Sequence, residues 1–272
     1  MLTRRVLLVS AAAFPLASHA AANPFADLET RSGARIGVAA IDTGSGRQIL
    51  WRADERFLMC STFKFLLVAA VLKRIDAGLE VGERPIRYSQ SDVLEYAPIT
   101  KLHVADGMTV YALCDAAIRY SDNTAGNLLL AAVSGPPAVT RFARSLGDSV
   151  TRLDRIEPAV NFADGDKDTT TPAAMLHHLR QILLGDLLGE PSRKFLTAWL
   201  YANMRGDTLL RAGLPEHWLI GDKTGRSLAG AVNDIAIAAP PGRAPLLISV
   251  YTKGGGDRIV AEIGRMIAAR LN

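Results

Sequence analysis

Two side chains that can perform acyl chemistry together lie three residues apart at the start of an apolar segment. We predict a helix over residues 62–77, and at its opening turn Ser61 and Lys64 would share one face, because side chains at i and i+3 lie one above the other. A lysine amine in apolar surroundings can accept the proton of a nearby serine, and a helix N-terminus favours the negative charge that forms on the oxygen. The pattern therefore indicates a serine nucleophile, although a capping serine followed by an exposed lysine would have the same spacing.

Two further motifs place polar groups beside predicted helices and strands. Ser121 and Asn123 lie between two predicted helices, where a plain turn is the simplest interpretation. Lys223 and Thr224 follow a predicted strand over residues 218–222, where an exposed hairpin tip is the simplest interpretation. Taken alone, each motif favours this simple structural role over a functional one.

The sequence lacks the motifs of several other kinds of functional site. It has no H-E-x-x-H, no cysteine pair at zinc spacing and no phosphate-binding G-x-x-x-x-G-K. It also has no G-x-S-x-G, so a Ser-His-Asp hydrolase is poorly supported. His177 and His178 adjoin each other on a predicted helix and point to different faces, while His103 and His217 are expected to be surface or hydrogen-bonded residues. We expect no metal and no organic cofactor.

The elements that must position these motifs fall into two groups. Strand patterns occupy residues 36–41 and 48–51 near the beginning, and 218–222, 232–238 and 246–251 near the end. Helical patterns cover 62–77, 109–120, 123–133, 172–184 and 258–271. The simplest arrangement is one antiparallel sheet made from strands at both ends of the chain, with a helical block inserted between them. The polar stretch 161–168 is predicted to be a surface loop.

The overall charge argues against a nucleic-acid-binding protein. The 272 residues include 31 Lys or Arg and 27 Asp or Glu, a formal net charge of +4, and no basic run is interleaved with aromatic residues. With 49% hydrophobic and 21% charged residues, the chain has the composition of an ordinary globular protein with a sizeable core. Cys60 and Cys114 are expected to be buried free thiols.

The first 22 residues have the pattern of an export signal. Arg4 and Arg5 precede an apolar stretch over residues 6–16 that is too short to span a bilayer, and small residues follow it. The paired arginines also fit a twin-arginine signal loosely. We predict a protein exported to the periplasm or the medium, with no membrane anchor on the mature chain.

The three motifs together, in this order, resemble those of the penicillin-recognising serine enzymes. Within that group the chain is similar to the class A serine β-lactamases, because residues 155–161, which include Glu157, and residues 168–172 resemble the omega loop of that family. Penicillin-binding proteins share the three motifs but generally lack this glutamate. The similarity extends over nearly all of the mature chain.

This resemblance implies a fold class and a domain organisation. The fold would be α/β (α+β), with a five-stranded antiparallel sheet flanked by N- and C-terminal helices and an inserted all-helical domain, as in β-lactamases and DD-peptidases. We expect a signal peptide over residues 1–22 and a discontinuous α/β domain over 23–56 and 207–272. The all-helical domain would cover 57–206 and include the omega loop, 155–168.

The resemblance also implies a role for each site residue. Ser61 would attack the lactam carbonyl, and Lys64, Glu157 and a water molecule would share the work of the base. Ser121 would pass a proton to the departing nitrogen, while Asn161 would hold the water against Glu157. The backbone N–H groups of Ser61 and Arg226 would form an oxyanion hole. Arg155 and Asp168 would close the loop as a charge pair. The residues expected to bind substrate are Asn123, Asn161, Lys223, Thr224, Gly225, Arg226 and Tyr96.

The sequence departs from the family pattern in two places. The loop is about two residues shorter than usual, with Val160 where leucine is typical. Arg226 occupies a position that usually carries a small or hydroxyl side chain, and the arginines with which other members bind the substrate carboxylate are replaced by Leu209 and Val232. One hypothesis is that Arg226 supplies that charge through a bidentate contact; the alternative is that it points to solvent.

The resemblance predicts a β-lactamase that hydrolyses β-lactam antibiotics through a serine acyl-enzyme, with no nucleic-acid partner and no obligate protein partner, and hence a monomer. Two alternatives stay open. One is a DD-peptidase or penicillin-binding protein with cell-wall peptide as its substrate. The other is a penicillin sensor that acylates without turnover, which the short loop would allow.

Overall fold

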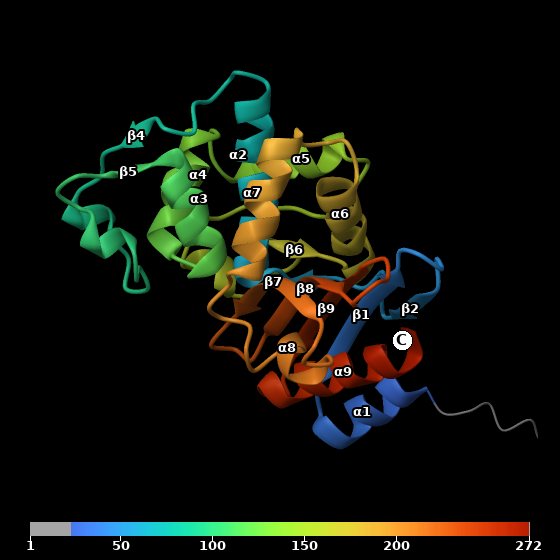
Figure 1. The fold of residues 1–272 in the computed structure, drawn as a ribbon. Coiled ribbons are helices and arrows are strands. Elements are labelled where there is room, and N and C mark those ends of the chain that lie inside the picture. The colour runs from blue at the N-terminus through green and yellow to red at the C-terminus, as the bar shows by residue number, and fades with distance from the viewer. Residues whose placement is uncertain (1–22, 272) are drawn as a thin grey trace, which may run out of the picture.

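The computed structural model describes residues 23–271, and the predicted export signal over residues 1–22 lies outside them. Within the described residues, five strands form one antiparallel sheet in the order β2-β1-β9-β8-β7 (Figure 1). β1 pairs with β9 along its whole length, with Val38 opposite Val250, so segments from the two ends of the chain lie side by side in the sheet. The predicted sheet is therefore confirmed. Its strands are β1 Arg35–Asp42, β2 Gln48–Trp51, β7 Leu219–Arg226, β8 Val232–Ala239 and β9 Leu246–Lys253.

The remaining elements are helices and two short strand pairs. The helices are α1 Pro24–Ser32, α2 Phe63–Asp76, α3 Val110–Arg119, α4 Asn123–Ala132, α5 Pro136–Ser145, α6 Pro172–Leu184, α7 Glu190–Tyr201, α8 Leu210–Gly213 and α9 Gly256–Leu271. β3 Phe57–Leu58 pairs with β6 Thr169–Thr170, and β4 Pro85–Ile86 pairs with β5 Met108–Thr109. No helix within residues 23–271 is long and apolar enough to cross a membrane.

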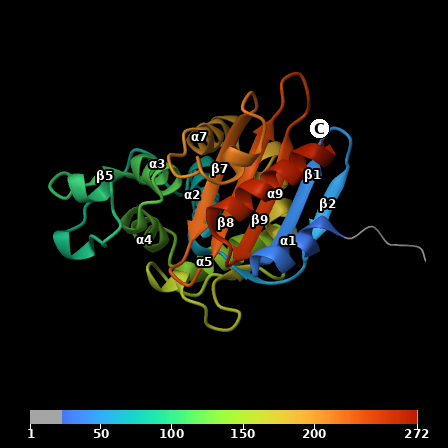
Figure 2. The same cartoon turned by 90° about the horizontal axis from the view of Figure 1, so that it is seen from below.

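The sheet separates two hydrophobic cores because successive residues of a strand point to opposite faces. On β1, Ile36, Val38 and Ala40 pack with α1, α8 and α9, whereas Ala39 and Ile41 pack with the helical block around α2. Figure 2, seen from below, shows α1 and α9 lying across the first of these faces. Both faces of the sheet are therefore covered, and the helical block inserted between β3 and β7 stands on the other one (Figure 1).

The sequence patterns did not predict α5, α7 and α8, whereas the N-terminal helix that the resemblance implied is present as α1. Two of the missed helices bury only a narrow stripe: in α5 the buried residues are Val139 and Ala143, and in α7 they are Ser192, Leu196 and Leu200. By contrast α2 buries every residue from Phe63 to Leu72, and α6 begins at Pro172 and ends at Leu184 as predicted. A broad apolar surface is a clear helical signal, whereas two or three apolar residues among polar ones are a weak one.

At two of the motifs, the helix or strand has different bounds in the structure from those predicted. Ser61 belongs to a 3₁₀ turn, η1 Cys60–Thr62, that leads into α2, rather than to the α-helix itself. The strand predicted over 218–222 is β7, which continues through Lys223 and Thr224 to Arg226 because it pairs with β8 over all eight residues. The interpretation of Lys223 and Thr224 as a hairpin tip is therefore wrong.

The segment that enters the predicted omega loop is fixed by a buried carboxylate. Asp148 accepts hydrogen bonds from the backbone N–H groups of Val150 (2.6 Å) and Thr151 (3.1 Å), and its other oxygen lies 2.8 Å from Nε2 of His178 on α6. Burial alone would raise the pKa of Asp148, but the hydrogen bonds from His178, Thr151 and Val150 hold the pKa well below its usual range. The pair joins α6 to the start of the loop.

We predict that Asp148 stabilises the fold in a pH-dependent way. A depressed pKa adds stability above the unfolded-state pKa of about 3.9, and that stability is lost as the pH falls below it. Asp148→Ala should lower the free energy of unfolding by about 2 kcal/mol at pH 7, and the difference from wild type should narrow towards pH 3. Denaturant unfolding at both pH values measures this, with Asp106→Ala, an exposed carboxylate, as the control. A difference that stays constant between pH 7 and pH 3 contradicts the prediction.

Candidate active site

The ammonium group of Lys64 is the centre of the site. Its Nζ donates to Oγ of Ser61 (3.1 Å), to the carbonyl oxygen of Ser121 (2.8 Å) and to Oδ1 of Asn123 (2.7 Å). It also lies 3.0 Å from Oε1 of Glu157, and neither side chain of this ion pair is exposed to solvent. The first two sequence motifs and the glutamate of the predicted loop therefore meet at one atom.

Helix α2 buries Lys64 because it is apolar around its first turns. Phe63, Phe65 and Leu66 beside the lysine are fully buried. On the α4 side, Gly126 leaves room for the lysine stem, since a Cβ there would lie 3.0 Å from Cε of Lys64. Lys64 is fully buried, so the alternative of an exposed lysine after a capping serine is wrong.

Glu157 is held against Ser61 by several hydrogen bonds. Oγ of Ser61 donates to its Oε1 at 3.2 Å, and Nδ2 of Asn161 donates to its Oε2 at 2.6 Å. Its backbone N–H and C=O are both paired with the side-chain amide of Asn127 on α4, each at 2.9 Å. The carboxylate is therefore placed by hydrogen bonds at both its backbone and its side chain.

Residues 155–168 form a closed loop, as predicted. Asp168 is fully buried and accepts from the backbone N–H groups of Asp154 (2.7 Å) and Arg155 (2.9 Å). Its other oxygen, Oδ2, forms an ion pair with Arg155, whose Nε donates to it at 2.5 Å. Residues 162–167 between these anchors are exposed, in agreement with the predicted surface loop.

Ser121 and Lys223 form a hydrogen-bonded pair beside Lys64 and Glu157. Nζ of Lys223, on β7, donates to Oγ of Ser121 at 3.0 Å. Ser121 has a left-handed backbone (φ 58°), and the neighbouring buried Asp122 holds that turn by accepting from the N–H groups of Thr100 and Ala125, both at 2.9 Å. The turn between α3 and α4 thus directs the Ser121 hydroxyl towards β7.

The charge of Lys223 is set by its surroundings. Burial and the nearby ammonium of Lys64 lower the pKa of Lys223 to about 7. Behind it on the sheet, burial raises the pKa values of Asp222 and Asp234, and Arg211 pairs with Asp222 at 2.5 Å. Lys223 therefore titrates near neutral pH in the free protein.

Strand β7 passes close to Ser61 because Gly225 has no side chain. A Cβ at Gly225 would lie 2.7 Å from the carbonyl oxygen of Met59 and 3.2 Å from the backbone nitrogen of Ser61. Any larger residue would push β7 away from the 3₁₀ turn that carries Ser61. Cys60 on that turn is a buried free thiol, and so is Cys114, as predicted.

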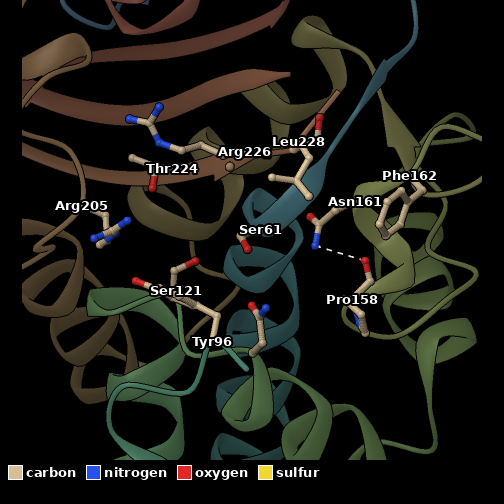
Figure 3. Close-up of a pocket in the computed structure, with 13 residues that line it drawn as sticks. Ser61, Tyr96, Ser121, Pro158, Asn161, Phe162, Arg205, Thr224, Arg226 and Leu228 are labelled. Carbon is tan, nitrogen blue, oxygen red and sulfur yellow. Dashed lines mark hydrogen bonds between the residues drawn. The ribbon is translucent and has the colours of Figure 1, made fainter. Parts of the chain in front are cut away.

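A cleft of about 460 Å³ opens above Ser61. Figure 3 shows Ser61 between Thr224 on one side and Asn161 with Phe162 on the other. The cleft is lined by Ser61, Tyr96, Ser121, Asn123, Pro158, Asn161, Phe162, Arg205, Thr224, Gly225, Arg226, Ser227 and Leu228. Most of the predicted site residues line this cleft, whereas Lys64, Glu157 and Lys223 are buried beneath it.

The structure modifies both hypotheses for Arg226. Its guanidinium is paired with Asp257 of α9: Nη2 lies 2.8 Å from Oδ2, and Nη1 contacts Oδ1. The side chain therefore neither stands free for a substrate nor points simply to solvent. No sequence pattern predicts this pair, because the two residues lie 31 positions apart.

Five cleft residues were not among the predicted site residues, namely Pro158, Phe162, Arg205, Ser227 and Leu228. Phe162 (54% exposed) and Leu228 (99% exposed) present apolar side chains, and Arg205 presents a guanidinium. Single exposed residues in loops carry no periodic pattern, so their place in the cleft follows only from the fold. Within residues 23–271, no group of three or more His, Cys, Asp or Glu side chains is arranged to hold a metal ion.

The sequence was compared with protein families and with known proteins. Residues 20–271 match the model of the β-lactamase enzyme family. The chain is 50% identical over 261 residues to the β-lactamase AST-1 of Nocardia asteroides, covering 93% of this chain and 84% of that protein. It is 47% identical over 247 residues to the β-lactamase OXY-2 of Klebsiella oxytoca, covering 90% and 85%.

Solved structures give the same result. An ancestral class A β-lactamase (GNCA) superposes with a TM-score of 0.89 and 54% identity, covering 91% of this chain and 98% of that one. The putative class A β-lactamase PenP from Rhodopseudomonas palustris gives a TM-score of 0.87 and 50% identity, covering 90% and 97%. The predicted family and fold are confirmed: this chain belongs to the β-lactamase enzyme family, as a class A serine hydrolase.

Proposed function

We propose that Ser61 is acylated by the carbonyl of a β-lactam ring and that Glu157 directs a water molecule at the resulting ester. The observation that carries this proposal is the position of the Glu157 carboxylate, 3.2 Å from Oγ of Ser61 and 3.0 Å from Nζ of Lys64. A base in contact with the nucleophile can serve both the formation and the hydrolysis of an acyl-enzyme.

In the first step Oγ of Ser61 attacks the lactam carbonyl carbon. Its proton passes to the base formed by Lys64, Glu157 and a bridging water, since both side chains contact Oγ. The backbone N–H groups of Ser61 and Arg226 would stabilise the oxyanion, a role that does not depend on the arginine side chain. The close approach of β7 to η1 at Gly225 supports the proposal that the N–H groups of Ser61 and Arg226 act together on the oxyanion.

In the second step the C–N bond of the ring breaks and the nitrogen takes a proton. Ser121 is the proposed donor, and its hydroxyl oxygen is contacted by Nζ of Lys223 at 3.0 Å. A cation beside a hydroxyl makes the loss of its proton easier. Ser121 would then regain a proton from Nζ of Lys223, which donates to the same hydroxyl oxygen, and water in the cleft would carry the proton that the base took from Ser61 back to Lys223.

In the third step water attacks the ester carbonyl and releases Ser61. Asn161 donates to Oε2 of Glu157 at 2.6 Å, so it would hold the water against the carboxylate. The product is the ring-opened acid, and the enzyme returns to its starting state. No cofactor is required for this sequence.

Substrate binding is proposed for residues around the cleft. Lys223 and Thr224 would meet the carboxylate of the substrate, and Asn123 would hydrogen-bond the amide of its side chain. Tyr96, which is 38% exposed on the cleft wall, would pack against the ring system. Gly225 and the backbone of Arg226 would complete the β7 edge of the site.

Three further expectations belong to the same proposal. The protein would be exported by a signal in residues 1–22, through the Sec or the twin-arginine route, to the periplasm or the medium. It would act as a monomer. The division into an α/β domain (23–56 and 207–272) and an all-helical domain (57–206) also stays a prediction.

We predict that Glu157→Ala will acylate but not turn over. Removing the carboxylate leaves the nucleophile and Lys64 in place but slows attack by water, by about 100-fold or more for a positioned general base. An intact-mass time course with a simple penicillin should show an adduct that clears within seconds in wild type and persists in the variant.

The control is Glu216→Ala, which removes an exposed carboxylate and should behave as wild type does. If wild type also keeps its adduct, the protein is a penicillin-binding or sensing relative and the role of Glu157 is wrong. If Glu157→Ala clears as fast as wild type, another group activates the water.

We also predict that kcat/KM for a carboxylate-bearing β-lactam falls as the pH rises above about 7. The lowered pKa of Lys223 means that its ammonium is charged below pH 7 and neutral above it, so attraction to the substrate carboxylate weakens with rising pH. In Lys223→Arg this descending limb should move beyond pH 9, because guanidinium stays charged. A wild-type profile that is flat from pH 6 to pH 9 contradicts the prediction.

A further inference from the structure

The cleft is cationic at one end and apolar at the other. Figure 3 shows Arg205 on the Thr224 side of Ser61 and Phe162 on the opposite side, beside Asn161. Lys223 lies beneath the cationic end, where its Nζ contacts Ser121. A substrate with an anionic group at one end and an apolar group at the other would therefore bind in one orientation.

The two arginines that line the cationic end differ in their partners. Arg226 forms a two-point ion pair with Asp257, whose Oδ2 also accepts from Oγ1 of Thr208 at 2.5 Å. The positive charge of Arg226 is therefore offset within the protein. A substrate carboxylate would have to compete with Asp257 for it.

Arg205 has no such partner among residues 23–271. Its exposed guanidinium lies over the ring of Tyr96, with the carbon 5.5 Å from the ring centroid, and it forms no ion pair with a described carboxylate. A cation–π contact at an exposed site is weak, so it orients the side chain without neutralising its charge.

The backbone that carries Arg205 is fixed beside Lys223. The N–H of Arg205 donates to Oδ1 of Asn203 at 3.1 Å, and Nδ2 of Asn203 donates to Oδ2 of Asp222 at 2.9 Å. Gly206 packs so closely on Asp222 that a Cβ would lie 1.9 Å from its Oδ2. Because Asp222 precedes Lys223 on β7, the segment places Arg205 at the same end of the cleft as that lysine.

We propose that Arg205, rather than Arg226, is the arginine that binds the carboxylate of the substrate and so determines preference for anionic β-lactams. This inference rests on the proposed function, because it names the carboxylate of a bound β-lactam as the ligand. A guanidinium can bind a carboxylate through two parallel N–H···O bonds, whereas Lys223 offers a single point of charge. A guanidinium in general also keeps its charge over the pH range in which the lowered pKa of Lys223 makes that lysine neutral.

The test compares one penicillin with its methyl ester, which lacks the negative charge. kcat and KM are measured for wild type, Arg205→Ala, Arg205→Lys and Arg226→Ala. For the free acid, Arg205→Ala should lower kcat/KM by about tenfold, mainly through KM, as expected for one charged contact, and Arg205→Lys should recover part of the loss. For the ester, Arg205→Ala should change kcat/KM less than about twofold.

The matched control is Arg265→Ala, which removes an exposed arginine on α9, on the far face of the sheet. It should leave both substrates unaffected, so a general effect of net charge would be recognised. Equal losses for acid and ester in Arg205→Ala overturn the inference, as does an acid-specific loss in Arg226→Ala but not in Arg205→Ala. Wild-type turnover of the free acid tests the proposed function separately, since it does not depend on Arg205.

Discussion

The rest of the site depends on the buried ion pair between the ammonium of Lys64 and the carboxylate of Glu157. A charge without solvent contact is stable only if the protein supplies partners, and here they come from the η1 turn, the α3–α4 turn, α4 and the loop 155–168. Glu157 is equally buried, and its charge has the same requirement. The fold must therefore bring these segments together to satisfy one ion pair, and this places Ser61, Glu157 and the turn at Ser121 within reach of one another.

A second set of buried polar groups fixes the backbone of each segment. Asp122 holds the turn that carries Ser121, and Asn127 holds the backbone of Glu157. Asp168 closes the loop, and Asp148 with His178 fixes its approach. These groups do not line the cleft, but they fix the backbone segments that carry Ser121, Glu157 and the loop between Arg155 and Asp168. Precise placement of a catalytic set requires this kind of support, because a hydrogen bond is lost over a shift of less than 1 Å.

Much of the site could be predicted from the sequence because its residues occur in short motifs. Ser61 with Lys64 needs one helical turn, and Ser121 with Asn123 needs one loop, so spacing alone suggests proximity within each motif. Their convergence came from a resemblance to a family, since no periodic pattern relates Glu157 to Lys64. The Arg226–Asp257 pair and the place of Arg205 were not predictable, because they depend on how α9 and the 203–206 segment pack against β7. The same limit applies to α5 and α7, whose narrow buried stripes become meaningful only against α2 and its neighbours.

The most direct test of this account is a double-mutant cycle on Lys64 and Glu157, measured as the free energy of unfolding. The variants are Lys64→Met, Glu157→Gln and the two combined. If the buried pair joins helix to loop, each single change leaves an uncompensated buried group, and the double variant should be more stable than the sum of the single effects by more than about 1 kcal/mol. If the two effects add within about 0.5 kcal/mol, the residues do not support each other and the ion pair is not the constraint that organises the site.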